Sequence, residues 1–242
     1  MIPKEFQAHY DRLCYGRSRK DVFCYFLDVC LYYLSVGMLS EDYLRITKQY
    51  KKENMPLFLE MLQIVGDNSE GFRDVLGDVF MDFVSHGHNG QFFTPMHITD
   101  MMSIITGCDS LSPEQSVCDP ACSSGRTLLS AAKLCAEKNE GERPFYYGSD
   151  IDITCVKMAV INMLLNSIPG EIAWMNALTM EHWRNYCVDL MLIRGVWLPT
   201  LKVKNKGQTS FVRRLEKTYE EKTEIKDRVI ENVKPVQLSF EF

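Results

Sequence analysis

Apolar residues recur at helical spacing through the first third of the chain. Between positions 69 and 86 they follow the i, i+3, i+4, i+7 rule, which predicts an amphipathic helix packed on a larger body. The opposite face of this helix carries three aspartates, Asp74, Asp78 and Asp82. A second, strongly apolar helix is expected over 21–37, with Gly37 as its stop. Residues 1–89 are therefore expected to form an N-terminal helical domain.

From position 91 the pattern changes to short apolar runs that alternate with helical segments. The runs predict strands at 117–118, 145–148, 171–174 and 188–193. Helices are expected between the first three strands, at 125–136 and 152–166, and a shorter helix is expected over 98–105. Strands separated by helices of this length predict βαβ units and a parallel sheet, so residues 90–200 are expected to form an α/β domain. Residues 201–242 are rich in charge and predict a charged helical tail.

Composition limits the possible classes of function. The 242 residues are 46% hydrophobic and 24% charged, which fits one or two globular domains and excludes a mainly disordered chain. The net charge of −5 argues against a protein that binds nucleic acid with its whole surface, because phosphates are neutralised by clustered Lys and Arg. Contact with DNA would need a local patch or a partner. The length is also short for an enzyme that both reads and modifies DNA.

Cysteine usage and hydropathy indicate a cellular location. The cysteine count is nine, which is odd, and no CxxC pair occurs, so we expect reduced thiols and a cytoplasmic protein without a zinc ribbon. The most apolar stretch, 22–38, has the length of a membrane span but contains Asp28. A carboxylate in the middle of a span is costly, so we expect a soluble chain with no membrane contact.

The most informative segment runs from Val117 to Thr127 and joins a predicted strand to a predicted helix through Asp119 and a loop of small residues. Ligands of open α/β sheets bind beyond the carboxyl ends of strands, where small residues let the backbone approach and a helix N-terminus offers free N–H groups. The next strand ends in Asp150, 25 residues after Gly125, where a carboxylate can accept hydrogen bonds from ribose hydroxyls. Each feature alone also fits an ordinary strand-to-helix turn. Together they favour an adenosine-type ligand, and the single glycine of the loop argues against a dinucleotide.

The same segments resemble the N6-adenine DNA methyltransferases, and among them the modification subunits of type I restriction systems. The run 119–125, Asp-Pro-Ala-Cys-Ser-Ser-Gly, resembles the first motif of that family, which usually continues Asp-Pro-Ala-Cys-Gly-Ser-Gly-Gly. Upstream, residues 90–95 match the family's Gly-Gln-aromatic-aromatic-Thr-Pro motif. Downstream, 148–152 and 175–178 are similar to the family's Gly-x-Glu-Ile-Asp strand and its Gly-Asp/Asn-x-Leu turn. The likeness covers roughly residues 70 to 197.

The resemblance implies a doubly wound, Rossmann-like methyltransferase domain that binds S-adenosylmethionine and follows a helical domain. Carried over position by position, it implies a set of cofactor-binding residues: Phe93 and Thr94 at the methionine end, Asp119, Ala121 and Gly125 at the amino-acid and sugar region, Asp150 at the ribose, Ile151 at the adenine, and Asn176 with Ala177 at the adenine amino group. In the first motif Ser123 and Arg126 replace two glycines. A serine with positive φ would cost about 1 kcal/mol, and Arg126 is expected to point outward from its helix.

The catalytic motif departs from the family. The family's fourth motif ends in Asn-Pro-Pro-aromatic, whereas alignment on Asp189 places Arg194, Gly195, Val196 and Trp197 there. The family's Asn oxygen accepts a hydrogen from the adenine amine. An arginine has five donors and no acceptor, so Arg194 cannot do this. Only Trp197 keeps a possible role, which is to stack on a flipped base.

Two functions follow from the resemblance. The first is S-adenosylmethionine-dependent N6-adenine DNA methylation of restriction-modification type, with DNA bound through a separate specificity subunit. The alternative is a catalytically inactive homologue that binds the cofactor and acts as a partner or regulatory subunit.

Three further signals stay open. His86 and His88 lack a third candidate ligand, so we expect no metal site. The basic run over 202–214 fits either a DNA-backbone contact or a solvated linker. The final residues 237–242, Gln-Leu-Ser-Phe-Glu-Phe, fit either a peptide that docks on the DNA sliding clamp or a terminal strand.

Overall fold

The fold is taken from a computed structural model, which describes residues 2–35, 39–85, 92–112, 115–138, 144–193 and 195–205. All of these belong to one compact unit, Met1–Gly207. Residues 206–242 of the expected charged helical tail lie outside the described residues, and with them most of the basic run over 202–214 and the terminal 237–242. His86, His88 and Arg194 lie outside them as well.

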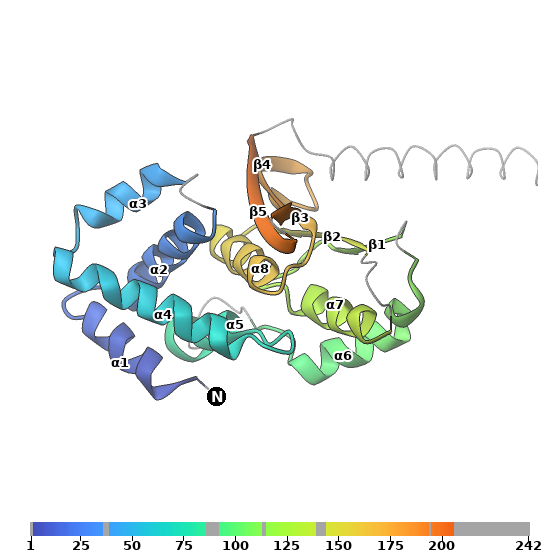
Figure 1. The fold of residues 1–242 in the computed structure, drawn as a ribbon, viewed down its shortest axis with the longest axis horizontal. Helices are drawn as coiled ribbons and strands as arrows, with labels where there is room; N and C mark the ends of the chain where they lie inside the picture. Colours follow the sequence, from blue (N-terminus) through green and yellow to red (C-terminus); the bar gives the residue numbers. More distant parts are fainter. Residues whose placement is uncertain are drawn as a thin grey trace, which may run out of the picture. The chain divides into compact units, whose positions relative to one another are not determined.

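The described residues before position 86 contain only helical elements (Figure 1). In chain order they are α1 (Lys4–Leu13), α2 (Arg19–Leu34), α3 (Ser40–Thr47), the short 3-10 helix η1 (Lys52–Asn54), α4 (Met55–Asn68), α5 (Val75–Val79) and the π-helix η2 (Phe80–Ser85). Of the helices in the described part of the chain, none combines the length and apolar character needed to span a bilayer.

The amphipathic helix expected over 69–86 begins later than the pattern predicts. Gly71 and Phe72 both have left-handed backbone conformations, with φ of +74° and +63°, so the chain cannot be helical there. Asp74 then caps α5 by accepting a hydrogen bond from the N–H of Gly77 at 2.8 Å. The apolar periodicity could not predict this turn, because the helical spacing of apolar residues continues through Phe72.

The remaining elements form the α/β part of the chain. They are α6 (Met96–Ile105), η4 (Cys108–Ser110), β1 (Ser116–Asp119), α7 (Arg126–Lys138), β2 (Phe145–Asp150), α8 (Ile153–Leu165), β3 (Gly170–Asn176), β4 (Glu181–Ile193) and β5 (Val196–Asn205). The five strands form one sheet in the order β1-β2-β3-β4-β5. Neighbours among β1, β2 and β3 are parallel, and β4 and β5 add in antiparallel fashion. The predicted α/β class with parallel βαβ units is confirmed.

The strand order fixes where the helices and strand ends lie. Both crossovers step in the same direction along the sheet, and right-handed crossovers of this kind place their helices on the same face. In Figure 1, α7 and α8 accordingly lie on one side of the sheet. Among the described strands β1 is an edge, with β2 on one side only. Asp119, Asp150 and Asn176 end the three parallel strands and therefore lie at the same end of the sheet.

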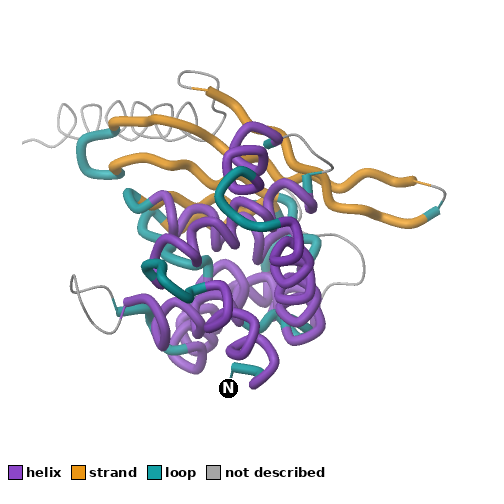
Figure 2. Tube along the Cα trace, turned by 90° about the vertical axis from the view of Figure 1, so that its left-hand side faces the viewer, coloured by secondary structure: helices purple, strands orange, loops and turns teal. Residues whose placement is uncertain are grey.

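The antiparallel strands extend the sheet in the other direction. Val188 of β4 pairs with Gly170, the first residue of β3, so residues 189–193 project beyond the amino end of β3. They pair with the first residues of β5 in a long hairpin, which Figure 2 shows as an arm beyond the rest of the sheet. The strand β5 continues to Asn205, so 201–205 belong to the sheet and not to the charged tail expected to begin at 201. In residues 201–204 apolar and charged side chains alternate, as in an edge strand with one exposed face. The lysines of that exposed face made the segment look like part of the charged tail.

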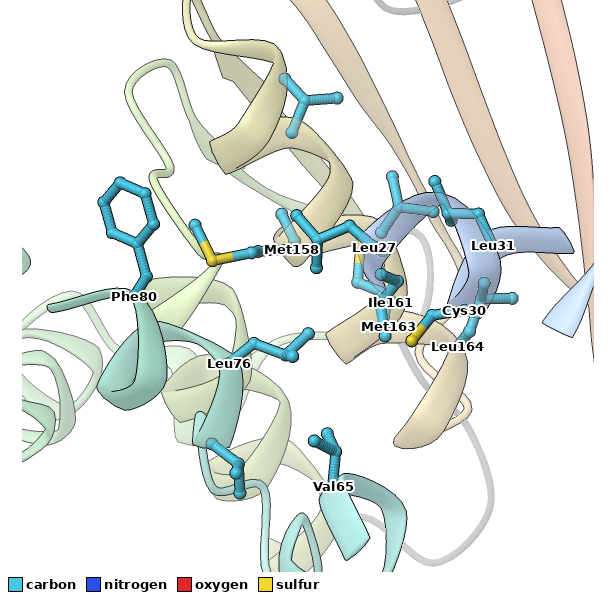
Figure 3. Packing of buried hydrophobic residues seen from close by; sticks show 14 of the residues in the cluster. Leu27, Cys30, Leu31, Val65, Leu76, Phe80, Met158, Ile161, Met163 and Leu164 are labelled. Carbon is cyan, nitrogen blue, oxygen red and sulfur yellow. The ribbon is translucent and has the colours of Figure 1, made fainter. Parts of the chain in front are cut away.

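The core joins the helical part to the α/β part. Side chains of α2, α5 and α8 interdigitate, with Leu27, Leu76 and Met158 at the centre (Figure 3). Fully burying one such side chain stabilises the fold by about 1.5–3 kcal/mol. All nine cysteines are free, and burial raises the pKa of the Cys30 thiol in this core well above its usual range.

Candidate functional site

The loop after β1 is held in shape by hydrogen bonds to the Asp119 carboxylate. Asp119 accepts a hydrogen bond from the N–H of Ala121 at 3.0 Å and another from the Thr127 hydroxyl. Ser123 and Gly125 have φ of +51° and +87°, so the serine that replaces the family's glycine does adopt the left-handed conformation expected of it. A Cβ on Gly125 would lie 3.3 Å from the Cβ of Ala159, so close packing on α8 also favours glycine there.

Asp150 joins this loop to the end of β2. One carboxylate oxygen accepts the N–H of Ser123 at 3.0 Å, and the other accepts the N–H of Asp152 at 2.9 Å. Each oxygen therefore retains a lone pair for a further donor. Burial raises the pKa of the Asp150 carboxyl above its usual range, while these two N–H groups oppose the shift. The loop over 119–125 and the Asp150 carboxylate, which was expected to bind the ribose, are thus in direct contact.

The residues expected around the adenine lie at the same end of the sheet. Ile151 follows β2 with 60% of its surface exposed, and its carbonyl accepts a hydrogen bond from the Trp174 indole at 3.0 Å. The Trp174 ring packs against that of Trp183, with ring centroids 5.1 Å apart. Ala177 follows Asn176 and is half-buried. The two tryptophans were not among the expected site residues, because nothing in the local pattern of β3 and β4 marks them.

The side-chain oxygen of Asn176 takes part in the turn that follows β3. Its side-chain oxygen accepts the N–H groups of Leu178 and Thr179, at 3.0 and 3.2 Å. An amide oxygen has two lone pairs, so these two bonds leave it no capacity to accept the adenine amino group. The Asn176 NH2 group makes no hydrogen bond to the described residues and is available as a donor.

Phe93 and Thr94 lie beside the start of α7. The Phe93 ring is buried and stacks on Phe80, with centroids 5.3 Å apart and an angle of 9° between the rings. The carbonyl of Thr94 faces Arg126 Nη1 at 3.5 Å. The segment expected at the methionine end of a cofactor is therefore next to the first-motif loop.

Arg126 does not point outward as expected. It is 8% exposed, and its guanidinium forms ion pairs with Asp74 at 2.5 Å and with Asp78 at 2.6 Å. Periodicity placed both aspartates on a polar, outer face, yet the Asp74 side chain is buried. A carboxylate is buried when it gains charged and hydrogen-bonding partners, and these come from a segment about 50 residues away in the chain. Local pattern cannot show such a partner.

Of the residues aligned with the catalytic motif, the described ones do not lie near this site. Arg194 lies outside the described residues. Trp197 pairs with Leu192 in the β4–β5 hairpin, beyond the amino end of β3, and 60% of its surface is exposed. Asp119, Asp150 and Asn176 lie at the carboxyl ends of the strands, so Trp197, which was expected to stack on a flipped base, lies toward the opposite end of the sheet from them.

The geometry suits an adenosine compound that also carries an amino-acid group. The carboxylate of Asp150 can accept two hydroxyl donors, Ile151 offers an apolar contact, and the loop leads into the N-terminus of α7, where free N–H groups favour a carboxylate. Within the described residues no cluster of three or more metal-ligating side chains occurs.

Comparison with known families agrees with this geometry. The family model for N-6 DNA methylase matches residues 71–197, which is more than half of the chain and nearly the range over which the sequence resemblance extends. The chain belongs to the N-6 DNA methylase family. The matched range begins just before α5 and ends within the β4–β5 hairpin, so this family segment includes Asp74 as well as both motif aspartates.

Curated relatives of this family member are much longer. The chain is 34% identical over 104 residues to the type II restriction enzyme and methyltransferase RM.BcgI of Heyndrickxia coagulans, covering 38% of this chain and 16% of the relative. It is 29% identical over 125 residues to the type I restriction enzyme MpnII methylase subunit of Mycoplasma pneumoniae, covering 48% of this chain and 23% of the relative. The chain therefore spans less than a quarter of the length of these relatives.

Among solved structures, a putative class I S-adenosylmethionine-dependent methyltransferase from Listeria monocytogenes is similar over 70% of this chain and 51% of its own. The TM-score is 0.46 and the sequence identity is 16%.

Proposed function

We propose that this chain binds S-adenosylmethionine and supplies the cofactor-binding part of an N6-adenine DNA methyltransferase of restriction-modification type. The observation that carries the proposal is the link between the first-motif loop and Asp150, in which Ser123 and Asp152 donate to the two carboxylate oxygens. This link sets the loop and the carboxylate at the end of one sheet, as a nucleoside with an attached amino acid requires.

In this proposal each site residue contacts a different part of the cofactor. Asp150 accepts the ribose hydroxyls, Ile151 packs on the adenine, and Asn176 donates to an adenine ring nitrogen through its NH2 group, with Ala177 beside it. The loop from Asp119 through Ala121 to Gly125 holds the amino-acid and sugar region, and Phe93 with Thr94 borders the methionine end. When bound, the cofactor supplies a methyl group on a positively charged sulfur.

DNA and protein partners complete the proposed activity. The relatives are long enough to hold sequence recognition outside the matched range, and the Mycoplasma pneumoniae relative is named a type I restriction enzyme methylase subunit. We therefore propose that the chain acts on DNA together with a separate specificity subunit, in the cytoplasm. Lys202 and Lys204 on β5 offer local positive charge to a DNA backbone.

A second candidate, a homologue that binds the cofactor but does not transfer the methyl group by itself, is favoured by the sheet. The strand aligned with the catalytic motif, β4, pairs antiparallel with β3, so its final residues lie at the amino end of β3, whereas Asp119 and Asp150 lie at the carboxyl ends of their strands. An acceptor for the adenine amine would then have to come from elsewhere.

The test combines binding with transfer. S-adenosylmethionine is titrated calorimetrically, and transfer of a labelled methyl group to adenine-rich DNA is measured for the native chain and for an Arg194→Asn, Gly195→Pro, Val196→Pro variant. Binding with no transfer by either protein is expected of the chain alone, because residues 189–193 and 196–200 of the β4–β5 hairpin lie beyond the amino end of β3, away from Asp119 and Asp150. Transfer by the native chain would remove the second candidate, and absence of binding would overturn both.

A further inference from the structure

One buried side chain touches both segments that border the proposed cofactor site. Arg126, where the resembling family usually has glycine, opens α7 and is almost fully buried. Its Nε donates to Asp74 Oδ2 at 2.5 Å and its Nη2 donates to Asp78 Oδ1 at 2.6 Å. Charge-assisted bonds of this length are the stronger class of hydrogen bond, and two of them fix the plane of the guanidinium.

Asp74 carries this constraint into the first-motif loop. Its carboxylate accepts hydrogen bonds from the Gly77 N–H, the Ser124 hydroxyl and the Asn162 amide as well as from Arg126. Asn162 also donates to the carbonyl of Ser124 at 2.9 Å. Ser124 is thus held by its side chain and by its backbone. It stands between Ser123 and Gly125, the two residues of the loop with positive φ.

The other face of the guanidinium borders the upstream segment. Its Cζ atom lies 5.8 Å from the centroid of the Phe93 ring, within the range of a cation–π contact. Its Nη1 points to the Thr94 carbonyl. The Phe93 ring cannot move away on its other side, because it stacks on Phe80.

We propose that Arg126 is a positioning residue which, through Asp74, holds the first-motif loop and the Phe93–Thr94 segment at the separation that the cofactor requires. Arg126 does not itself contact the cofactor in this assignment. The inference rests on the proposed function for the identity of the ligand, but the holding of the loop is a property of the unliganded chain.

Hydrogen exchange of the backbone amides measures the loop directly. In Arg126→Gln, the amides of peptides covering 119–127 are expected to exchange at least about tenfold faster than in the native chain, because the loop loses its anchor. The matched control is Lys133→Gln, which removes a cation from the same helix. Lys133 pairs with Asp100 at 3.7 Å on the surface, and exchange in the loop should not change.

A second variant covers the case in which Arg126→Gln does not fold. Asp78→Asn removes one arm of the cluster at a half-exposed carboxylate and leaves the Asp74 pair intact, so a smaller increase in the same peptides is expected. Arg126→Lys should restore protection only in part, because a single ammonium cannot bind both carboxylates in the planar geometry of a guanidinium.

Calorimetric titration with S-adenosylmethionine separates positioning from stability. Arg126→Gln is expected to weaken binding about tenfold or more at a temperature where it is fully folded, whereas Lys133→Gln binds as the native chain does. A folded Arg126→Gln protein with native loop exchange and native affinity would overturn the inference, whatever its melting temperature. Absence of binding by the native chain would overturn the proposed function instead, and the exchange data would still decide whether Arg126 holds the loop.

Discussion

Gly77 provides a sharp test of the buried cluster around Asp74. A Cβ built on Gly77 would lie 1.9 Å from Asp74 Oδ2 and 2.7 Å from the Ser124 hydroxyl, so Gly77→Ala must push the carboxylate away from its partners. The Gly77 N–H also donates the capping bond to Asp74. Breaking a buried ion pair costs about 3–5 kcal/mol, and loss of a helix cap costs about 0.5–2 kcal/mol.

Alanine is intrinsically better than glycine in a helix by about 1 kcal/mol, which offsets part of this loss. The free energy of unfolding is therefore expected to fall by about 3 kcal/mol or more. This is a large share of the roughly 5–15 kcal/mol that is typical of a domain. Urea unfolding followed by far-ultraviolet circular dichroism measures the change.

The matched control is Gly66→Ala in α4. A Cβ there would lie 3.8 Å from the nearest atom, a Leu165 methyl group, which is ordinary contact. This variant should gain about 0.5–1 kcal/mol from helix propensity alone. Opposite signs for the two substitutions are the expected result. A Gly77→Ala protein within about 1 kcal/mol of the native chain would refute the tight packing of Gly77 on the Asp74 cluster.

Three further predictions concern the loop, its pH dependence and the hairpin. Ser123→Gly should stabilise the chain by up to about 1 kcal/mol in the same urea assay, because φ of +51° suits glycine, and a loss of stability would contradict this. Since burial raises the pKa of Asp150, this carboxyl contributes stability to the unliganded chain at low pH that is lost as pH rises through the raised value. Affinity for S-adenosylmethionine should weaken as pH falls through the pKa of Asp150, because the ribose hydroxyls donate to the ionised carboxylate. Calorimetric titration at several pH values measures this, and an affinity that does not change with pH would contradict it. Trp197→Ala should leave that affinity unchanged, since Trp197 lies on the hairpin, and a weakened affinity would place the hairpin at the site.

The sequence was sufficient to predict the elements that local pattern and motif spacing encode. The β1 loop, the position of Asp150 and the helices α6, α7 and α8 all lie close to their predicted ranges, because strand, turn and helix signals there agree with one another. The motif has glycine at position 125, and the left-handed φ of Gly125 gives the physical reason for a glycine there.

Features that depend on distant partners could not be predicted. The burial of Arg126 requires Asp74 and Asp78, which the helical pattern assigned to an outer face. The direction of β4 depends on which edge of the sheet it joins, and a single apolar run does not encode that choice. The side-chain oxygen of Asn176 likewise accepts two hydrogen bonds from the turn that follows it. The residue type at this motif position could not predict those bonds.

The most direct test of the cofactor site compares two neighbouring substitutions by calorimetric titration with S-adenosylmethionine. Asp150→Asn removes the charge of the carboxylate that accepts hydrogen bonds from both ribose hydroxyls. Each such bond is worth about 1.5–3 kcal/mol, so affinity for S-adenosylmethionine should fall at least about 100-fold. Asp152→Asn makes the same chemical change two residues later, where Asp152 caps α8 through the Thr154 N–H at 2.8 Å, and asparagine caps equally well. Affinity of the second variant should stay within about threefold of the native value. Native affinity in Asp150→Asn, or an equal loss in both variants, would contradict the assignment of Asp150 to the ribose.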